Sequence, residues 1–220
     1  MHTLVIDIGG TNVKMRLSGQ DEVRRFPSGH DLTPTSLLEG VRESTKDWNY
    51  DRVSIGYPGP VLKEKILLEP VNLGKGWIGF DFSAALGKPV HIINDAAMQA
   101  LGSYEGGRML FLGLGTGLGT TLIVDGVVAP MELGHLPYKK GRSFEDYVGN
   151  AGLLRLGKKK WRTIVADVVE RLKNAFVADY VVLGGGNVKK LPALPPDCRA
   201  GCNSHAFVGG ERLWEGTNSR

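Results

Sequence analysis

Two glycine-rich turns in this sequence have the pattern of phosphate-binding hairpins. Residues 4–17 (LVIDIGGTNVKMRL) return in pattern at residues 110–123 (LFLGLGTGLGTTLI), each as an apolar run, a turn of small residues and a second apolar-patterned run. Such a pattern predicts two strands joined by a tight turn. Because glycine has no Cβ atom, these turns can bring backbone N–H groups close to an anion. The sequence therefore predicts one phosphate-binding hairpin built twice.

The two copies differ at a charged position. Gly9 corresponds to Gly115, but Asp7 in the first copy corresponds to Gly113 in the second. A carboxylate beside a phosphate is unfavourable unless a cation lies between them. We therefore expect Mg²⁺ on one side only, held near Asp7 through water.

The segment INDAAMQALG at residues 93–102 offers a candidate general base. A strand is predicted to end and a helix to begin there, which places Asp95 at or beside a helix N-terminus. The helix dipole favours the ionised carboxylate that a base abstracting a hydroxyl proton needs. From these residues alone, an ordinary N-cap formed by Asn94 or Asp95 is an equally good interpretation.

Hydrophobic periodicity and breaker residues predict the elements that position these groups. The boundary between two lobes is expected at Gly106-Gly107, and a Pro-rich connector at residues 191–203. Besides the hairpins, we expect strands at 21–26, 52–56, 89–93, 127–129 and 180–184, and helices at 33–47, 95–104, 143–156, 159–176, just after the glycines at 184–186, and at 204–214.

Five further segments carry a family resemblance. They are GYPGPV at 56–61, PVNLGKGW at 70–77, INDAAMQALG at 93–102, ELGH at 132–135 and VVLGGGNV at 181–188. With the two hairpins they resemble the ROK family of sugar kinases and repressors, part of the actin-like ATPase and hexokinase superfamily. The resemblance runs from residue 4 to about residue 214. It implies an α/β, two-lobed actin-like ATPase (ribonuclease H-like) fold, with a mixed sheet in each lobe and an interlobe cleft.

The internal repeat and the resemblance together give a domain prediction. Residues 1–106 would form the N-terminal lobe with the first hairpin, the catalytic aspartate and part of the sugar pocket. Residues 107–203 would form the C-terminal lobe with the second hairpin, the Glu-x-Gly-His segment and the adenosine loop. A terminal helix at 204–215 would join the N-terminal lobe.

The resemblance also assigns roles to acceptor residues. Asp95 matches the catalytic base that acts on the 6-hydroxyl of a sugar, and Glu145 in FEDY matches a third sugar-contacting acid, although the cysteine motif that usually precedes it is missing. Carboxylates, amides and imidazoles suit sugar hydroxyls, which both donate and accept hydrogen bonds. The implied sugar-binding residues are Asn94, Asp95, Glu132, His135, Glu145, Asn72 and Gly59.

The donor site is assigned in the same way. Phosphoryl transfer depends mainly on positioning and charge stabilisation, so two phosphate turns, Mg²⁺ and one base suffice without a covalent intermediate. No glycine cluster fits the G-x-G-x-x-G or the G-x-x-x-x-G-K-[ST] pattern, which excludes Rossmann-type and Walker-type sites. The implied donor-binding residues are Asp7, Gly9, Gly10, Thr11, Asn12, Lys14, Gly115, Thr116, Gly117 and, under the adenosine, Gly184, Gly185 and Gly186.

Composition limits the class of protein. The 220 residues include 27 Lys and Arg against 23 Asp and Glu, a net charge of +4 that favours polyanionic ligands without indicating nucleic-acid binding. No run approaches the ~18 apolar residues of a membrane span, and no secretory leader is apparent. We expect a soluble cytoplasmic protein, with no membrane partner, that forms a homodimer as ROK proteins often do.

The two cysteines give weak evidence for a metal site. Cys198, Cys202 and His205 have the spacing C-x3-C-x2-H, but three ligands from one loop without an evident fourth make a poor zinc site. Many ROK proteins carry a cysteine-rich zinc motif after the Glu-x-Gly-His segment. Residues 136–147 (LPYKKGRSFEDY) contain no cysteine, so no zinc is expected.

A basic run, KKKWR at 158–162, lies close in sequence to Lys139, Lys140 and Arg142. It is either a solvated helix face or a track for a long polyanion such as inorganic polyphosphate. Short length and the absent zinc motif resemble the polyphosphate-glucokinase branch. We therefore predict a glucokinase that uses polyphosphate, ATP or both.

Three alternatives stay open or lose weight on specific grounds. A kinase for an N-acetylated hexosamine differs only in the space around the sugar 2-position, which the sequence does not reveal. A ROK repressor would need a helix-turn-helix module, for which the hairpin starting at Leu4 leaves no room. A sugar sensor without catalysis would not need both Asp7 and Asp95.

Overall fold

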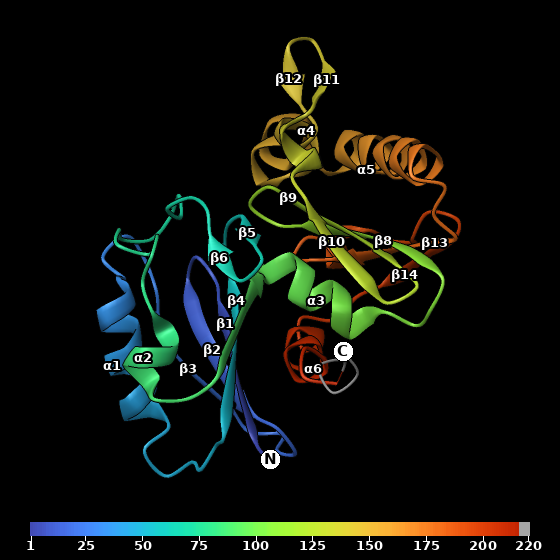
Figure 1. Cartoon of the computed structure of the whole chain (residues 1–220). Coiled ribbons are helices and arrows are strands. Elements are labelled where there is room, and N and C mark those ends of the chain that lie inside the picture. Colours follow the sequence, from blue (N-terminus) through green and yellow to red (C-terminus); the bar gives the residue numbers. More distant parts are fainter. Residues whose placement is uncertain (216–220) are drawn as a thin grey trace. The chain divides into compact units, whose positions relative to one another are not determined.

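The protein, here a computed structural model described over residues 1–215, consists of two compact units (Figure 1). Of the described residues, the first unit comprises Met1–Met98 and 206–215, and the second comprises Gln99–His205. The chain passes between them inside helix α3 (Asp95–Ser103), earlier than the boundary predicted at residues 106–107. In residues 1–215, no helix is long and apolar enough to cross a membrane.

The first unit is built on a five-stranded mixed sheet. Its strands are β1 (Thr3–Ile8), β2 (Asn12–Leu17), β3 (Val23–Pro27), β4 (Arg52–Tyr57) and β7 (Val90–Asn94), in the order β3-β2-β1-β4-β7. The first three strands form an antiparallel meander, whereas β4 pairs parallel to β1 and β7 pairs parallel to β4. The carboxyl ends of β4 and β7 therefore lie at the same edge of the sheet as the β1–β2 turn.

The second unit repeats this sheet. Its strands are β8 (Arg108–Leu114), β9 (Leu118–Val124), β10 (Val127–Met131), β13 (Tyr180–Gly184) and β14 (Cys198–Ala200), in the order β10-β9-β8-β13-β14. Again three strands form an antiparallel meander and two are parallel. The repeat seen in the sequence thus extends from one hairpin to the whole sheet. The connector predicted at residues 191–203 contains the edge strand β14.

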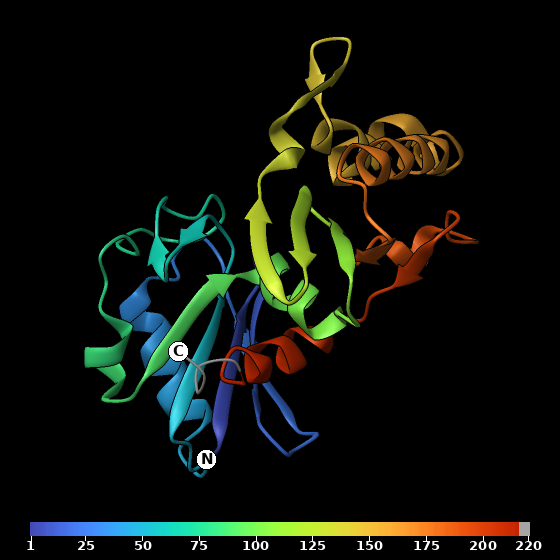
Figure 2. The same cartoon turned by 45° about the vertical axis from the view of Figure 1, so that its right-hand side comes forward.

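Helices cover both faces of the first sheet (Figure 2). Helices α1 (Pro34–Ser44) and α2 (Phe82–Leu86) pack on the face that carries Leu4, Ile6 and Ile8. Val5 points to the other face, where it packs with Met98, Ala206 and Phe207 of α3 and α6 (His205–Arg212). Side chains alternate along a strand, so Asp7 lies on the face of Val5.

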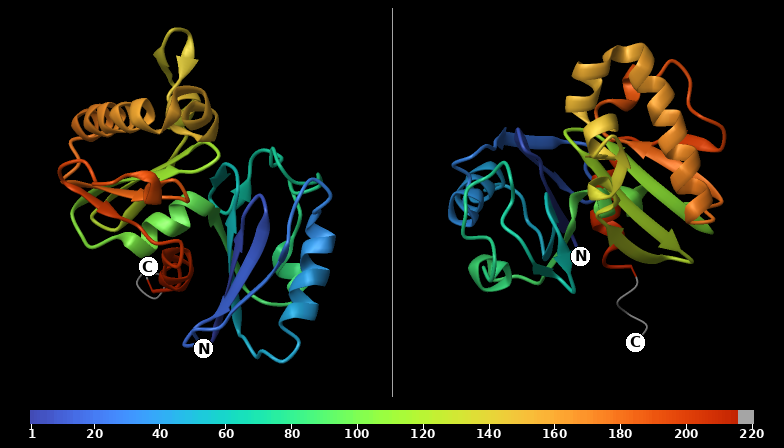
Figure 3. Two further views of the ribbon diagram at one scale, coloured as in Figure 1. Left: turned by 180° about the vertical axis from the view of Figure 1, so that it is seen from behind. Right: turned by 90° about the horizontal axis from the view of Figure 1, so that it is seen from above.

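The long helix of the second unit is kinked. Helix α5 (Asn150–Ala175) follows the short α4 (Glu145–Val148) and contains Gly157 in a non-helical conformation with φ of 71°. Only glycine adopts such a φ at low cost. Figure 3 shows the two parts of α5 at an angle, as predicted by separate helices at 143–156 and 159–176. Trp161 anchors the second part through burial and a bond from Nε1 to Val148 O at 2.8 Å.

Smaller elements complete the structure. Two hairpins, β5 (Val61–Leu62) with β6 (Lys65–Ile66) and β11 (Pro137–Lys139) with β12 (Arg142–Ser143), extend the two units. The second of them projects away from its sheet (Figure 2). Short 3-10 helices are η1 (Leu133–His135) and η2 (Val188–Lys190).

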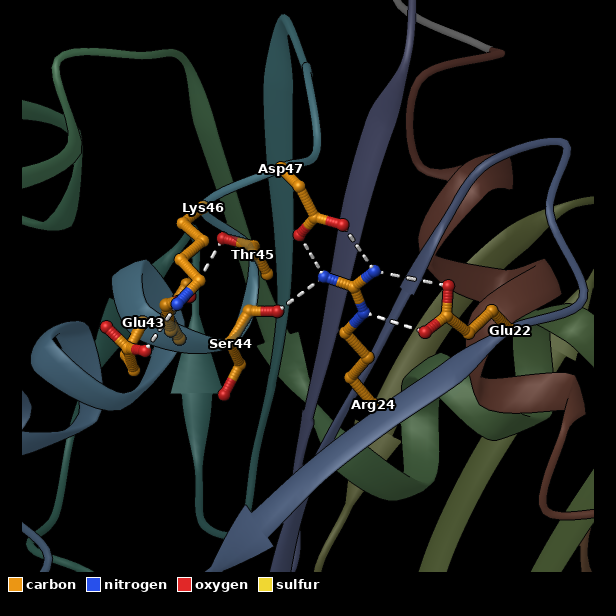
Figure 4. Close-up of polar contacts among 8 residues, drawn as sticks. Glu22, Arg24, Glu43, Ser44, Thr45, Lys46 and Asp47 are labelled. Atoms are coloured by element: carbon orange, nitrogen blue, oxygen red, sulfur yellow. Dashed lines mark hydrogen bonds and ion pairs between the residues drawn. The ribbon is translucent and has the colours of Figure 1, made fainter.

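A cluster around Arg24 ties the edge strand β3 to the end of α1 (Figure 4). The guanidinium donates to both carboxylate oxygens of Asp47, to Glu22 and to the carbonyl of Ser44. It also lies over the ring of Trp48, 4.1 Å from the centroid. Bidentate pairing to Arg24 lowers the pKa of Asp47 to about 2. The planar guanidinium makes contacts that a lysine would not reproduce.

We expect Arg24→Gln to lower the unfolding temperature at pH 7. The folded-state pKa of Asp47 is depressed, so the stabilisation is present above its ordinary value of 3.8 and is lost as pH falls toward about 2. The difference from wild type should therefore shrink across that window in thermal unfolding followed by circular dichroism.

The matched control is Lys46→Gln, which removes an exposed i,i+3 pair with Glu43 at 2.9 Å. Such pairs contribute little to stability. Equal unfolding temperatures for the two variants at pH 7 would show that the Arg24 cluster does not stabilise β3.

Candidate active site

The turn between β1 and β2 is open above its glycines. The N–H of Gly9 donates to Asn12 O at 3.0 Å, which closes the turn. A Cβ atom placed on Gly10 would meet, among the described residues, only the Cβ of Asn72 at 3.8 Å. Thr11 and Gly10 are exposed. The first predicted phosphate turn therefore borders the loop predicted to contact sugar.

Asp7 lies directly below this turn in the sheet. It is paired in register with Lys14, and its Oδ2 lies 3.9 Å from Lys14 Nζ. The Asp7 side chain is only 18% exposed. Burial raises the pKa of Asp7, and the charge of Lys14 partly opposes that rise. A second nearby cation would favour the carboxylate further.

Gly56, which the sequence analysis did not single out, joins this edge of the sheet. It is paired in register with Asp7 on β1 and Ile93 on β7. A Cβ atom at this position would lie 2.4 Å from Met98 Cε and 3.5 Å from Asp95 Cα. Gly56 thus allows the start of α3 to approach the sheet. Its place at the head of the GYPGPV segment was the available signal.

The structure shows which of Asn94 and Asp95 caps α3. Asn94 takes the cap, because its Oδ1 accepts the N–H of Ala97 at 3.1 Å. Its Nδ2 donates to Gly59 O at 3.1 Å, which ties the helix start to the YPGP loop. Asp95 Oδ1 accepts the adjacent N–H of Ala96 at 2.7 Å. The helix therefore has its cap without using Asp95 for it.

The loop containing Asn72 is held rigidly at its base. Trp77 is fully buried, and its Nε1 donates to Gly74 O at 2.8 Å. The carboxylate of Glu69 accepts the backbone N–H groups of Gly76 and Trp77, each at 3.2 Å. These bonds fix the loop while Asn72 itself remains exposed.

In the second unit, the turn between β8 and β9 has one open glycine and one filled glycine. The N–H of Gly115 donates to Gly117 O at 3.2 Å, and a Cβ atom on Gly115 would meet no described atom within 4 Å. Thr116 between them is exposed. At Gly117 a Cβ atom would lie 2.4 Å from Glu145 Oε2. The space that a side chain at Gly117 would take is therefore occupied by Glu145, a predicted sugar-binding residue.

Three predicted sugar-binding residues come together in the second unit. His135 Nε2 lies 3.4 Å from Glu132 Oε2, and His135 Nδ1 lies 3.5 Å from Glu145 Oε1. One imidazole therefore stands between two carboxylates. Partial burial raises the pKa of Glu132, the charge of His135 lowers it, and Glu145 raises it further. Such a cluster offers both donors and acceptors to hydroxyl groups.

The three glycines after β13 differ in what they permit. Gly184 lies against the ring of Phe111, and Gly185 has φ of 82° with its missing Cβ 2.4 Å from Leu114 O. At Gly186 a Cβ atom would meet no described atom within 4 Å. Two of the glycines therefore seat the loop on β8, and the third is open.

No group of three or more His, Cys, Asp or Glu residues placed to hold a metal ion occurs among residues 1–215. Cys198 lies in β14, and Cys202 Sγ accepts a bond from Ser204 Oγ at 3.0 Å. His205 Nδ1 lies 2.8 Å from Ser103 Oγ. Cys202 and His205 thus each form a hydrogen bond with a serine side chain.

The lysines at 158–160 differ from Lys139 in their surroundings. Lys158, Lys159 and Lys160 are exposed at the start of the second part of α5. Lys139 is instead paired with Asp167 at 3.1 Å. The first three are therefore the better candidates for contact with a polyanion.

The chain matches known proteins along most of its length. The pattern of the ROK family matches residues 3–150. Polyphosphate glucokinase of Mycobacterium tuberculosis is 26% identical over 218 residues, covering 89% of this chain and 81% of the relative. N-acetylmannosamine kinase of Escherichia coli O157:H7 is 32% identical over 142 residues, covering 57% of this chain and 48% of that protein.

Solved structures show the same fold. Inorganic polyphosphate/ATP-glucomannokinase from Arthrobacter sp. strain KM superposes with a TM-score of 0.81 and 25% identity, covering 96% of this chain and 97% of that one. A ROK family glucokinase from Streptomyces griseus, in complex with glucose and AMPPNP, superposes with a TM-score of 0.73 and 16% identity, covering 97% and 99% of the two chains. The predicted actin-like ATPase fold with a mixed sheet in each half is thereby confirmed.

The matching pattern covers the first hairpin, the segment around Asp95, the second hairpin and the Glu132–His135 segment. Its extent and the similarity to sugar kinases agree with the geometry of the two units. The chain belongs to the ROK family and is a sugar kinase of that family.

Proposed function

We propose that this kinase transfers a phosphoryl group from polyphosphate, ATP or both to the 6-hydroxyl of glucose. The observation that carries the proposal is the position of the Asp95 carboxylate at the N-terminus of α3, in a helix that Asn94 caps, because the helix dipole favours the ionised form that a base needs. The names of relatives support the donor and the sugar, since one is a polyphosphate glucokinase and another a polyphosphate/ATP-glucomannokinase.

In the proposed mechanism the chain positions both substrates and moves one proton. Asp95 would take the proton of the attacking hydroxyl, while Asn94, Asn72, Gly59, Glu132, His135 and Glu145 hold the sugar. The N–H groups of the turns at Gly9–Asn12 and Gly115–Gly117, with Lys14, would hold the phosphates, and Gly184–Gly186 would lie under an adenosine.

Mg²⁺ fits the surroundings of Asp7. This ion is usually bound by one or two carboxylates together with phosphate oxygens and waters. Asp7 supplies one such carboxylate, 18% exposed, below the turn predicted to hold the phosphates. When bound, the ion would neutralise charge on the transferred phosphoryl group. We expect no structural zinc.

One alternative acceptor has an observation in its favour. The N-acetylmannosamine kinase relative is more similar in sequence, at 32% identity, although over a shorter span. Phosphorylation assays with glucose and N-acetylmannosamine in parallel test the choice. Product from neither sugar with either donor would favour a sugar-sensing protein without catalysis.

We further expect a homodimer, which sedimentation measures directly.

Asp95→Asn is expected to reduce turnover by about 10²- to 10⁴-fold, since a positioned general base contributes about that much. Binding of glucose, measured by calorimetry, should change little because the amide keeps the size of the carboxylate and one oxygen that accepts from a sugar hydroxyl.

The matched control is Asp81→Asn, since Asp81 caps α2 by accepting the Ala84 N–H at 2.9 Å. It should keep nearly full turnover. A turnover of Asp95→Asn close to that of Asp81→Asn would place the base elsewhere.

Substituting Lys158, Lys159 and Lys160 by Gln is expected to lower kcat/KM for polyphosphate by about tenfold or more at low salt. A long polyanion gains from every exposed lysine along its path, whereas kcat/KM for ATP should change by less than about twofold. Steady-state kinetics with each donor gives both values.

A charge-matched control replaces the exposed residues Arg25, Arg42 and Lys46 of the first unit by Gln. This variant has the same net charge, so it separates local contact from overall attraction. If kcat/KM fell equally for polyphosphate and ATP, or equally in the two triple variants, the lysines at 158–160 would be a solvated helix face without a role in binding polyphosphate.

A further inference from the structure

The two phosphate turns share a feature that neither hairpin supplies by itself. Gly9 and Gly115 occupy equivalent places in the repeat, and each backbone carbonyl accepts a hydrogen bond from a side chain outside its hairpin. Ser28 Oγ donates to Gly9 O at 2.6 Å. Asn187 Nδ2 donates to Gly115 O at 3.1 Å, alongside the N–H of Asn150 at 3.0 Å.

A bond to either carbonyl fixes the N–H group of the next residue. The C=O of Gly9 and the N–H of Gly10 belong to one planar trans peptide and point in opposite directions. The same relation joins Gly115 O to the N–H of Thr116. Glycine imposes little restraint on the rotation of such a peptide plane. If the plane turned over, a carbonyl oxygen would replace the N–H group toward the phosphate.

Ser28 is held at two points of the first turn. Besides the bond from its hydroxyl, its own N–H donates to Thr11 O at 3.0 Å. The next part of the same loop is also tied to the predicted sugar loop, because Gly74 N donates to Leu32 O at 3.0 Å. The segment from Ser28 to Leu32 thus braces the donor turn against the loop that carries Asn72.

Asn187 is held in one orientation by its neighbours. Its side chain is buried, with the residue only 4% exposed. Lys190 Nζ donates to Asn187 Oδ1 at 2.8 Å, and a lysine has no acceptor, so the amide nitrogen must face Gly115. That nitrogen also donates to Asn150 Oδ1 at 2.8 Å. The backbone N–H of Asn187 donates to Leu114 O at 3.0 Å, which places the residue directly beside the turn.

We propose that Ser28 and Asn187 are positioning residues of the phosphoryl-donor site, each fixing one turn peptide so that its N–H group faces the phosphate chain. The inference rests on the proposed function in one respect, namely that the anion at these turns is the phosphoryl donor. It adds Ser28, which lies outside every quoted motif, and gives a role to Asn187, which follows the three glycines in the VVLGGGNV segment. Preorganised N–H groups bind an anion without the cost of reorientation.

Ser28→Ala tests the first turn, with Ser28→Thr as the conservative variant that keeps the hydroxyl. The control is Ser18→Ala. Ser18 Oγ accepts the Thr3 N–H at 2.8 Å at the opposite end of the same hairpin. Ser18→Ala therefore removes a comparable side-chain bond from β1 and β2 without touching the turn.

We expect Ser28→Ala to lower kcat/KM for the donor by about five- to tenfold, the range set by loss of one hydrogen bond. Binding of tripolyphosphate, measured by calorimetry without sugar, should weaken by a similar factor. KM for glucose should stay within about twofold. Ser28→Thr should regain most of the loss, and Ser18→Ala should match wild type in every kinetic value.

The second turn provides an independent arm. Asn187→Asp keeps an acceptor for Lys190 but removes the donor to Gly115, so it should show the same donor-specific loss. Circular dichroism and the unfolding temperature report whether this buried variant folds. Should it fail to fold, the three serine variants decide the proposal alone.

The outcomes separate the inference from the function on which it rests. A wild-type protein that binds neither tripolyphosphate nor ATP overturns the proposed function. A wild type that binds and turns over the donor, while Ser28→Ala and Ser18→Ala behave alike, overturns the positioning role only. A lowered unfolding temperature in Ser28→Ala with unchanged donor binding and kinetics also overturns it, because it shows a purely structural bond.

Discussion

The arrangement of both units depends on one constraint of strand pairing. A central strand, β1 or β8, pairs antiparallel with the strand that follows it on one side and parallel with a later strand on the other. A turn that ends the central strand therefore lies at the same sheet edge as the carboxyl ends of the parallel strands. Asp7, Gly56 and Asn94 meet at that edge in the first unit, as Leu114 and Gly185 do in the second. The candidate site follows from this geometry.

Glycines at these edges serve two physical purposes. At Gly10 and Gly115 the missing side chain leaves open space, which suits the approach of an anion to backbone N–H groups. At Gly56 and Gly117 the missing side chain is replaced by a neighbour, Met98 in one case and Glu145 in the other. Gly56 therefore allows helix α3 to lie close to the sheet, and Gly117 allows the Glu145 carboxylate to lie close to the β8–β9 turn. A glycine motif therefore marks close approach without saying whether the approaching group is a ligand or the protein itself.

Charge is arranged locally. Asp7 is buried and faces Lys14, while Glu132 and Glu145 flank His135. Several surface cations are already matched, such as Arg24 with Asp47 and Lys139 with Asp167. The small positive net charge is therefore unevenly available to a polyanion, because these cations are already paired with carboxylates. Exposed lysines at the start of the second part of α5 stand out because the kink at Gly157 begins a new helical turn there.

Local pattern in the sequence determined the hairpins, most helices and strands, and the residue types of the candidate site, because turns and amphipathic periods are encoded within short segments. It could not determine which of Asn94 and Asp95 caps α3, since both side chains can do so and only the contact with Gly59 fixes one of them. Nor did the local pattern reveal strand β14 or the structural roles of Gly56, Ser28 and Asn187. Edge strand β14 is only three residues long, and the roles of the other three depend on partners distant in sequence. Tertiary structure decided these points because strand pairing, parallel at Gly56 and Asn187 and antiparallel at Ser28, brings such partners together.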